Sequence, residues 1–142
     1  HGTHVAGIAL GTGDSSRVNQ GYSPGSYLVD VKVMEDYGGS NSQSVLAGLQ
    51  WVINNKDTDW GNNASSRGIQ VVSMSFGRSS SDPRDDGNDD GTTAEANLVN
   101  QASENGLVCV AAIGNDGGNI VNSVGAADTS ITVGWLDDNR SK

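Results

Sequence analysis

Residues 106–114 read GLVCVAAIG and are followed directly by Asn115. A continuous apolar run of this length, bounded by glycines, is typical of a strand that is buried on both faces of a parallel sheet. Three further runs are rich in β-branched residues and are bounded by turn residues: SYLVDVKVM (26–34), GIQVVSMSF (68–76) and SITVGW (130–135). These four runs predict the strands of a buried sheet.

The run 106–114 also contains Cys109, which is the single cysteine of the chain. One cysteine excludes an internal disulfide. Because its neighbours in the run are apolar, we expect a buried and unreactive thiol.

A first helix is predicted between the first two strands, in NSQSVLAGLQWVINNK (41–56). Ser42 or Ser44 is the expected N-cap, since a serine hydroxyl can accept a hydrogen bond from the free N–H groups of the first turn. Apolar residues recur at the i, i+3 and i+4 spacing of one helix face. They are Val45, Leu46, Leu49, Val52 and Ile53.

A second helix is predicted in TTAEANLVNQASEN (92–105). Thr92 and Glu95 have the T-x-x-E spacing of a capping box, and Gly106 follows where the C′ glycine of a helix belongs. The expected apolar stripe consists of Ala94, Leu98 and Ala102.

Strands and helices therefore alternate along the chain, and HGTHVAGIALG (1–11) is a further helix of small residues. This alternation is the pattern of right-handed βαβ units, so the predicted fold class is α/β with a mostly parallel sheet. The 142 residues suit one domain, and we find neither an internal repeat nor a domain boundary in residues 1–142.

The chain is acidic, with a formal net charge of −9. Such a surface argues against nucleic acid and anionic membranes as partners, and it suits calcium, cationic substrates or a salty medium. No apolar run approaches the length of a membrane span.

Chemistry in open α/β sheets gathers at the carboxyl ends of the strands. Strand 106–114 leads into Asn115, whose amide could stabilise a developing oxyanion. The same residue could equally be a turn asparagine that tolerates a left-handed conformation. The residues alone leave both readings open.

Four stretches of this sequence resemble the subtilisin-like serine proteases, or subtilases. HGTHVAG is similar to the histidine motif of that family, VVSMSFG to its substrate-binding strand, and VCVAAIGNDG to the segment with its oxyanion asparagine. GYSPGSYLVDVKVM is similar to the connection into the next strand. They occupy residues 1–7, 71–77, 108–117 and 21–34, in the order of the family. The resemblance implies a three-layer α/β sandwich whose mostly parallel central sheet is incomplete in these residues.

The resemblance assigns catalytic roles to two residues, and it implies peptide-bond hydrolysis through an Asp-His-Ser triad. His1 matches the general base and Asn115 matches the oxyanion-hole donor. No G-T-S nucleophile motif occurs in the chain and nothing precedes His1, so we expect residues 1–142 to be the middle of a catalytic domain, inactive alone. A catalytically dead subtilase-like module that binds calcium or peptides is the alternative.

The resemblance also implies an extended peptide or protein substrate that adds strands to the edges of the enzyme. It further implies an extracellular, secreted enzyme that is monomeric when complete. Phe76 and Ile113 are bulkier than the small residues we expect at their places, which leaves the size of the specificity pocket open. The implied substrate-binding residues are Gly38, Gly39 and Ser40 on one edge, Ser75, Phe76 and Gly77 on the other, and Ala112, Ile113 and Gly114 on the far wall of the pocket.

Three other motifs in the sequence are misleading. His1 and His4 are spaced i, i+3 without an intervening glutamate, unlike the i, i+4 pair of zinc proteases. GYSPG (21–25) fits a nucleophile elbow, but Pro24 has no N–H to donate and the stretch precedes a strand, which makes Ser23 a turn residue. GTGDSS (11–16) follows a helix and lacks the third glycine of a nucleotide-binding loop.

The acidic loop SSSDPRDDGNDDG (79–91) contains half of a calcium-binding pattern. Asp86, Asn88 and Asp90 fit D-x-[DN]-x-[DN]-G, but the twelfth position is Asn97 and not glutamate. A structural calcium ion and a solvated acidic loop both remain open. No cofactor is expected to be required for the chemistry itself.

Overall fold

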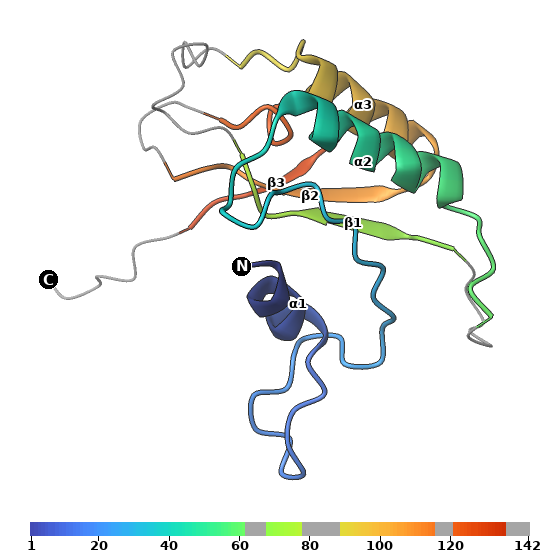
Figure 1. Cartoon of the computed structure of the whole chain (residues 1–142), viewed down its shortest axis with the longest axis vertical. Helices are drawn as coiled ribbons and strands as arrows, with labels where there is room; N and C mark the ends of the chain where they lie inside the picture. The colour runs from blue at the N-terminus through green and yellow to red at the C-terminus, as the bar shows by residue number, and fades with distance from the viewer. Residues whose placement is uncertain (62–67, 78–88, 116–120, 136–142) are drawn as a thin grey trace, which may run out of the picture. The chain divides into compact units, whose positions relative to one another are not determined.

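The computed structural model describes residues 1–61, 68–77, 89–115 and 121–135 (Figure 1). The chain forms two compact units, residues 1–31 and residues 32–142. None of the helices in these described ranges is long and apolar enough to cross a membrane.

The first unit contains α1 (Gly2–Leu10), which confirms the predicted N-terminal helix. The chain then returns to the end of this helix, where the N–H groups of Tyr22 and Ser23 donate to the carbonyls of Ile8 and Ala9. Gly21 permits this return, because a β-carbon there would lie within 3.0 Å of the backbone of Ala9, Leu10 and Gly11.

The strand predicted at 26–34 is wrong, because this segment joins no ladder among the described residues. Tyr27 and Leu28 are 65% and 61% exposed. An apolar run forms a strand only where a neighbouring strand accepts its backbone groups and another layer covers its side chains.

The second unit is built on a three-stranded parallel sheet in the order β1-β2-β3. The strands are β1 (Val71–Met74), β2 (Val108–Ala112) and β3 (Ile131–Val133). Val71 pairs with Val108, and Val110 pairs with Ile131. These strands lie inside three of the four predicted runs, and the incomplete parallel sheet confirms the α/β fold class.

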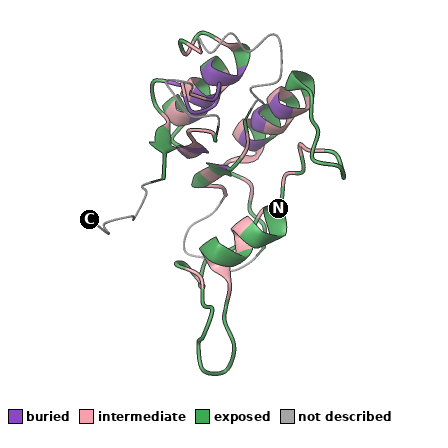
Figure 2. Ribbon diagram, turned by 90° about the vertical axis from the view of Figure 1, so that its left-hand side faces the viewer, coloured by how far each residue is buried: buried purple, intermediate pink, exposed green. Residues whose placement is uncertain are grey.

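Two helices cover one face of this sheet, α2 (Ser42–Asn55) and α3 (Ala94–Glu104) (Figure 1). Figure 2 places the buried residues on the facing sides of these helices and on the strands beneath them. The apolar core consists of Val45, Leu49 and Val52 from α2, Ala96, Val99 and Ala102 from α3, and Met74, Leu107, Cys109, Ala111, Val124 and Ala127 from the strands and loops.

The opposite face of the sheet is apolar but half exposed in this unit. Val71, Val108, Ile131 and Val133 are between 46% and 57% exposed. The expectation that β2 is buried on both faces is therefore wrong within residues 32–142, because α2 and α3 lie on a single face. Alternate residues such as Cys109 and Ala111 are buried under the helices.

Neither helix is capped at its N-terminus by a residue that the sequence predicted. The side chain of Asn41, and not that of a serine, caps α2 by accepting from the N–H of Ser44 at 2.9 Å. Thr93 replaces Thr92 as the cap of α3 and accepts from the N–H of Ala96 at 3.3 Å. The buried residues of this helix include Ala96, Val99 and Ala102, so Ala102 of the predicted stripe is confirmed, whereas Leu98 is half-buried and Ala94 is exposed.

The C-terminal end of α3 is as predicted. Gly106 has a positive φ of 89°, and its N–H donates to the carbonyl of Ser103 at 2.9 Å. The N–H of Leu107 donates to the carbonyl of Ala102 at 3.2 Å. These two bonds form a Schellman motif, which turns the chain directly from α3 into β2.

Candidate active site

The carboxyl ends of β1 and β2 place two of the predicted substrate-binding segments next to each other. Ser75, Phe76 and Gly77 follow β1, while Ile113, Gly114 and Asn115 follow β2. The two strands are parallel neighbours, with Met74 paired to Ala111, so both exits leave the same edge of the sheet. This edge is where ligands bind in open α/β sheets.

Main-chain hydrogen bonds fix the exit of β2. The N–H of Ile113 donates to the carbonyl of Val133 at 2.9 Å, and the carbonyl of Ile113 accepts from the N–H of Asn122 at 3.0 Å. Gly114 then has a φ of 115°, a conformation that other residues rarely adopt. The chain turns sharply at this glycine and leaves Asn115 exposed beyond the end of the strand.

Sequence reasoning missed one residue of this edge, Asn122. Its side chain is buried, with 6% of the residue exposed. A β-carbon built on Gly77 would lie well inside 3.0 Å of all three amide atoms of Asn122, and one built on Gly114 would lie 3.1 Å from its Nδ2. The amide thus lies between the two strand-end glycines. No motif surrounds Asn122, so only the folded chain reveals this position.

The other predicted edge, Gly38 to Ser40, lies in a turn of the same unit. The N–H of Glu35 donates to the carbonyl of Gly39 at 2.7 Å, and the N–H of Gly38 donates back to the carbonyl of Glu35 at 3.0 Å. The hydroxyl of Ser40 donates to the carbonyl of Val33 at 2.6 Å. All three predicted residues are exposed, and their contact with a peptide stays a prediction.

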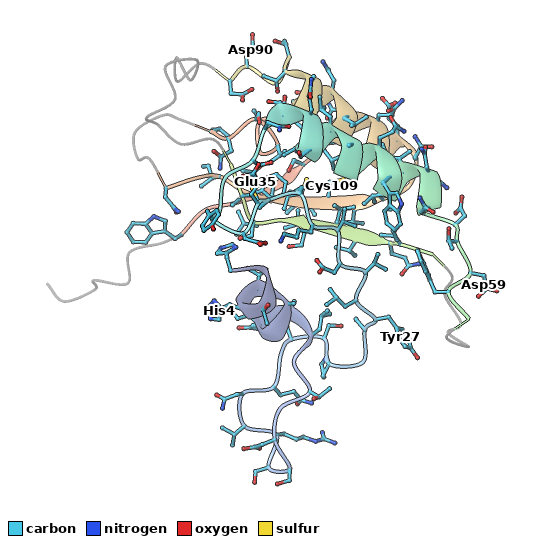
Figure 3. All side chains as sticks on the ribbon, in the orientation of Figure 1. His4, Tyr27, Glu35, Asp59, Asp90 and Cys109 are labelled. Carbon is cyan, nitrogen blue, oxygen red and sulfur yellow. The ribbon has the colours of Figure 1, made fainter. Side chains whose placement is uncertain are left out.

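His1 precedes the first turn of α1 in the other unit. It is the N-cap residue, its carbonyl accepts from the N–H of Val5 at 3.0 Å, and its side chain makes no capping hydrogen bond. His4 lies within α1 and projects from it (Figure 3). Both histidines are exposed. Among the residues that the structure describes, no group of three or more metal-binding side chains is close enough to hold an ion.

The half-match to a calcium loop falls mainly on residues 78–88, so Asp86 and Asn88 lie outside the described residues. Asp90 lies just before α3 (Figure 3). Its Oδ1 accepts from the hydroxyl of Thr92 at 2.6 Å and from the N–H of Thr92 at 3.1 Å. These hydrogen bonds, that from the hydroxyl first, lower the pKa of Asp90 below its ordinary value.

Two of the non-catalytic interpretations can be followed in the structure. Ser23 lies in a turn, where its carbonyl accepts from the N–H of Ser26 at 3.0 Å and the two hydroxyls are 2.6 Å apart. Cys109 is buried under the helices, 1% exposed, and burial raises the pKa of its thiol (Figure 3). Both agree with the structural roles expected from the sequence.

The fold and this edge together define an α/β protein in which two neighbouring parallel strands end at the same edge of the sheet. The sequence model of the subtilase family matches residues 1–142, the whole chain. The chain therefore belongs to the subtilase family, which is a family of serine peptidases.

Similar proteins agree with this assignment. The chain is 30% identical to subtilisin DY of Bacillus licheniformis, over 100% of this chain and 45% of that protein. It is 34% identical to the minor extracellular protease Epr of Bacillus subtilis (strain 168), over 94% of this chain and 17% of that protein. Among solved structures, sphericase superposes with a TM-score of 0.67 at 26% identity, covering 90% of this chain and 37% of sphericase. The chain thus spans less than half the length of these relatives.

Proposed function

We propose that these residues act within a subtilisin-like serine endopeptidase, in which His1 is the general base and Asn115 is an oxyanion-hole donor. The triad aspartate and the nucleophilic serine are supplied by parts of the protein outside this sequence. The observation that carries the proposal is the position of Asn115. Its amide is exposed at the exit of β2, beside the exit of β1, in a member of the subtilase family.

The proposed chemistry follows from the functional groups. The imidazole of His1 takes the proton of the nucleophilic serine as that oxygen attacks the peptide carbonyl, and it then returns the proton to the leaving amine. The carbonyl oxygen becomes negative in the tetrahedral intermediate. An amide N–H of Asn115, fixed by the turn at Gly114, donates to that oxygen and stabilises it.

The proposed substrate is an extended peptide or protein. Ser75 is exposed directly after β1, where a peptide could extend the sheet by main-chain hydrogen bonds. We further propose that the complete enzyme acts outside the cell as a monomer. The relatives include a protein described as an extracellular protease. Nucleic acid and anionic membranes do not fit a chain of net charge −9.

A structural calcium ion is kept as a proposal on the sequence pattern alone. Of Asp86, Asn88 and Asp90, only Asp90 lies within the described residues. Its Oδ1 already accepts two hydrogen bonds from Thr92. Its second oxygen would have to bind the ion.

The experiment uses the full-length protein that contains these residues. We expect it to hydrolyse chromogenic peptides, to be inactivated by a sulfonyl fluoride that modifies serine nucleophiles, and to lose activity in His1→Ala. The matched control is His4→Ala, which removes the second exposed imidazole from the same helix and should keep most of the activity. A folded protein that binds peptides without cleaving any would instead establish the catalytically dead module.

A further inference from the structure

Two indole side chains lie together on the surface near the C-terminal end of α2. Trp51 belongs to the helix and Trp60 to the chain that follows it, and their ring centroids are 6.1 Å apart at an angle of 38°. Trp51 is 40% exposed and Trp60 is 42% exposed. Single exposed apolar residues are common on protein surfaces, whereas adjacent exposed indoles are typical of binding surfaces.

Hydrogen bonds fix the chain that carries the second indole against the helix. The N–H of Thr58 donates to the carbonyl of Asn55 at 3.1 Å, and the Nδ2 of Asn55 donates to the carbonyl of Trp51 at 2.8 Å. Further along, the Oδ1 of Asp59 accepts from the N–H of Gly61 at 3.0 Å. A ligand that lies on both rings therefore meets a surface that is already ordered, which lowers the entropic cost of binding.

The surroundings of the two indoles carry negative charge. Asp57 and Asp59 follow α2 and are exposed, and Asp59 lies beyond the end of the helix (Figure 3). Lys56 balances one of these charges through its ion pair with Asp57 at 2.6 Å. The last turn of α2 contains no basic residue, so the helix dipole adds about half a negative charge at this end. Indole faces and negative charge together attract a cation.

We propose that Trp51 and Trp60 form an exosite that binds an arginine side chain of a protein substrate at a distance from the scissile bond. This inference rests on the proposed function. Arginine fits better than lysine, because its planar guanidinium stacks on aromatic rings and is more weakly hydrated than an ammonium group. The net charge of −9 also favours encounters with basic segments of a substrate.

The exosite and the exits of the strands lie at opposite edges of the sheet. The N–H of Ile69 donates to the carbonyl of Lys56 at 2.7 Å, so the end of α2 lies beside the chain that enters β1 (Figure 1). At about 3.3 Å per residue, the chain from Ile69 to the exit at Gly77 spans roughly 26 Å. An extended substrate needs about eight residues to cover this distance. Short chromogenic peptides are therefore too short to reach the exosite.

The binding test titrates a capped Gly-Arg-Gly peptide into the full-length protein, treated with the sulfonyl fluoride, and follows the indole N–H signals by NMR. The signals of Trp51 and Trp60 should shift in a saturable way, with a weaker response to Gly-Lys-Gly and none to Gly-Gln-Gly. Trp60→Leu keeps an apolar side chain without the aromatic face, and it should weaken binding by about 2- to 5-fold. Trp135→Leu is the matched control, because Trp135 is 74% exposed after β3. Asp59→Asn should weaken binding as well, and it decides if Trp60→Leu does not fold.

The kinetic test uses fluorogenic peptides with an arginine pair eight residues before or eight residues after the scissile bond, and analogues with a glutamine pair. One of the two arginine peptides should exceed its glutamine analogue in kcat/KM by about 2- to 5-fold at low salt. Trp60→Leu should lose this advantage and still cleave short chromogenic peptides like the wild type.

Three results would overturn the inference. Unchanged signals of Trp51 and Trp60 would exclude arginine binding. Equal kcat/KM for the arginine and glutamine peptides in an active enzyme would exclude a role in substrate selection, while the proposed function stands. An equal loss on all peptides in Trp60→Leu would assign the two indoles to anchoring of the chain after α2. Absence of hydrolysis by the folded wild-type protein would instead refute the proposed function and the substrate role with it, whatever the titration shows.

Discussion

The contact between Gly77 and Asn122 makes a sharp prediction about stability. In Gly77→Ala, the new β-carbon would overlap all three amide atoms of a side chain that is anchored and buried. Overpacking of this kind costs about 1–3 kcal/mol, and the anchored amide places the cost near the upper end. The φ of Gly77 is not positive, so alanine is allowed there and restricts the unfolded chain, which offsets about 0.4–1 kcal/mol. The free energy of unfolding should therefore fall by about 2 kcal/mol.

The second variant, Asn122→Gly, removes the atoms that the new methyl group would strike. In that background Gly77→Ala should be neutral or slightly stabilising, so the coupling energy of the double-mutant cycle is about 2–3 kcal/mol. Gly114→Ala is the control. Its φ of 115° strains any residue with a side chain by about 1–3 kcal/mol, and removing Asn122 does not relieve a backbone strain.

The assay is urea unfolding of the full-length protein and its variants, followed by tryptophan fluorescence. Coupling between Gly77 and Asn122 should be large, and coupling between Gly114 and Asn122 should be smaller. Additive effects of Gly77→Ala and Asn122→Gly would refute the reasoning, because they would place the amide away from Gly77.

Four further predictions concern the rest of the second unit. Thr93→Ala removes the side-chain cap of α3 and should lower the free energy of unfolding by about 1 kcal/mol. Thr92→Ala should raise the pKa of Asp90, as measured in an NMR titration. The stabilisation due to this carboxylate is present above its ordinary pKa and is lost as the pH falls through the lowered pKa. Because the pKa of the Cys109 thiol is raised, the folded state loses stability as the pH rises through that pKa. The buried thiol should react with an aromatic disulfide reagent only at the rate of unfolding. Fast labelling of the native protein would contradict its burial. Calcium should raise the melting temperature of the full-length protein over that in chelator, and the shift should shrink in Asp86→Ala/Asp90→Ala; an identical shift in both proteins would place the ion elsewhere.

Much of the second unit could be predicted from the sequence, because its signals are local. The runs at 68–76, 106–114 and 130–135 contain the three strands, and the periodicity of 41–56 matches α2. The positive φ of Gly106 was also predictable, since a glycine after a helical pattern supplies the conformation that ends the helix.

The failures occur where the outcome depends on contacts between distant segments. Two adjacent threonines have equal capping chemistry, and tertiary packing of Ala96 and Val99 selects Thr93. The run 26–34 has strand composition, but a strand needs a partner that composition does not supply. The sequence likewise predicts that Gly77 and Gly114 line a site, whereas Asn122 reaches them only through the turn after β2.

Steady-state kinetics of Asn115→Ala in the full-length protein test the central claim most directly. Loss of an oxyanion donor should lower kcat by about 10²–10³ with KM little changed, a magnitude taken over from subtilisin, which belongs to the same family. The acid limb of the kcat/KM profile should remain, because an amide does not titrate, while His1→Ala should lose far more activity. An Asn115→Ala enzyme with raised KM and intact kcat would contradict the account, because Asn115 would then bind substrate and transition state equally.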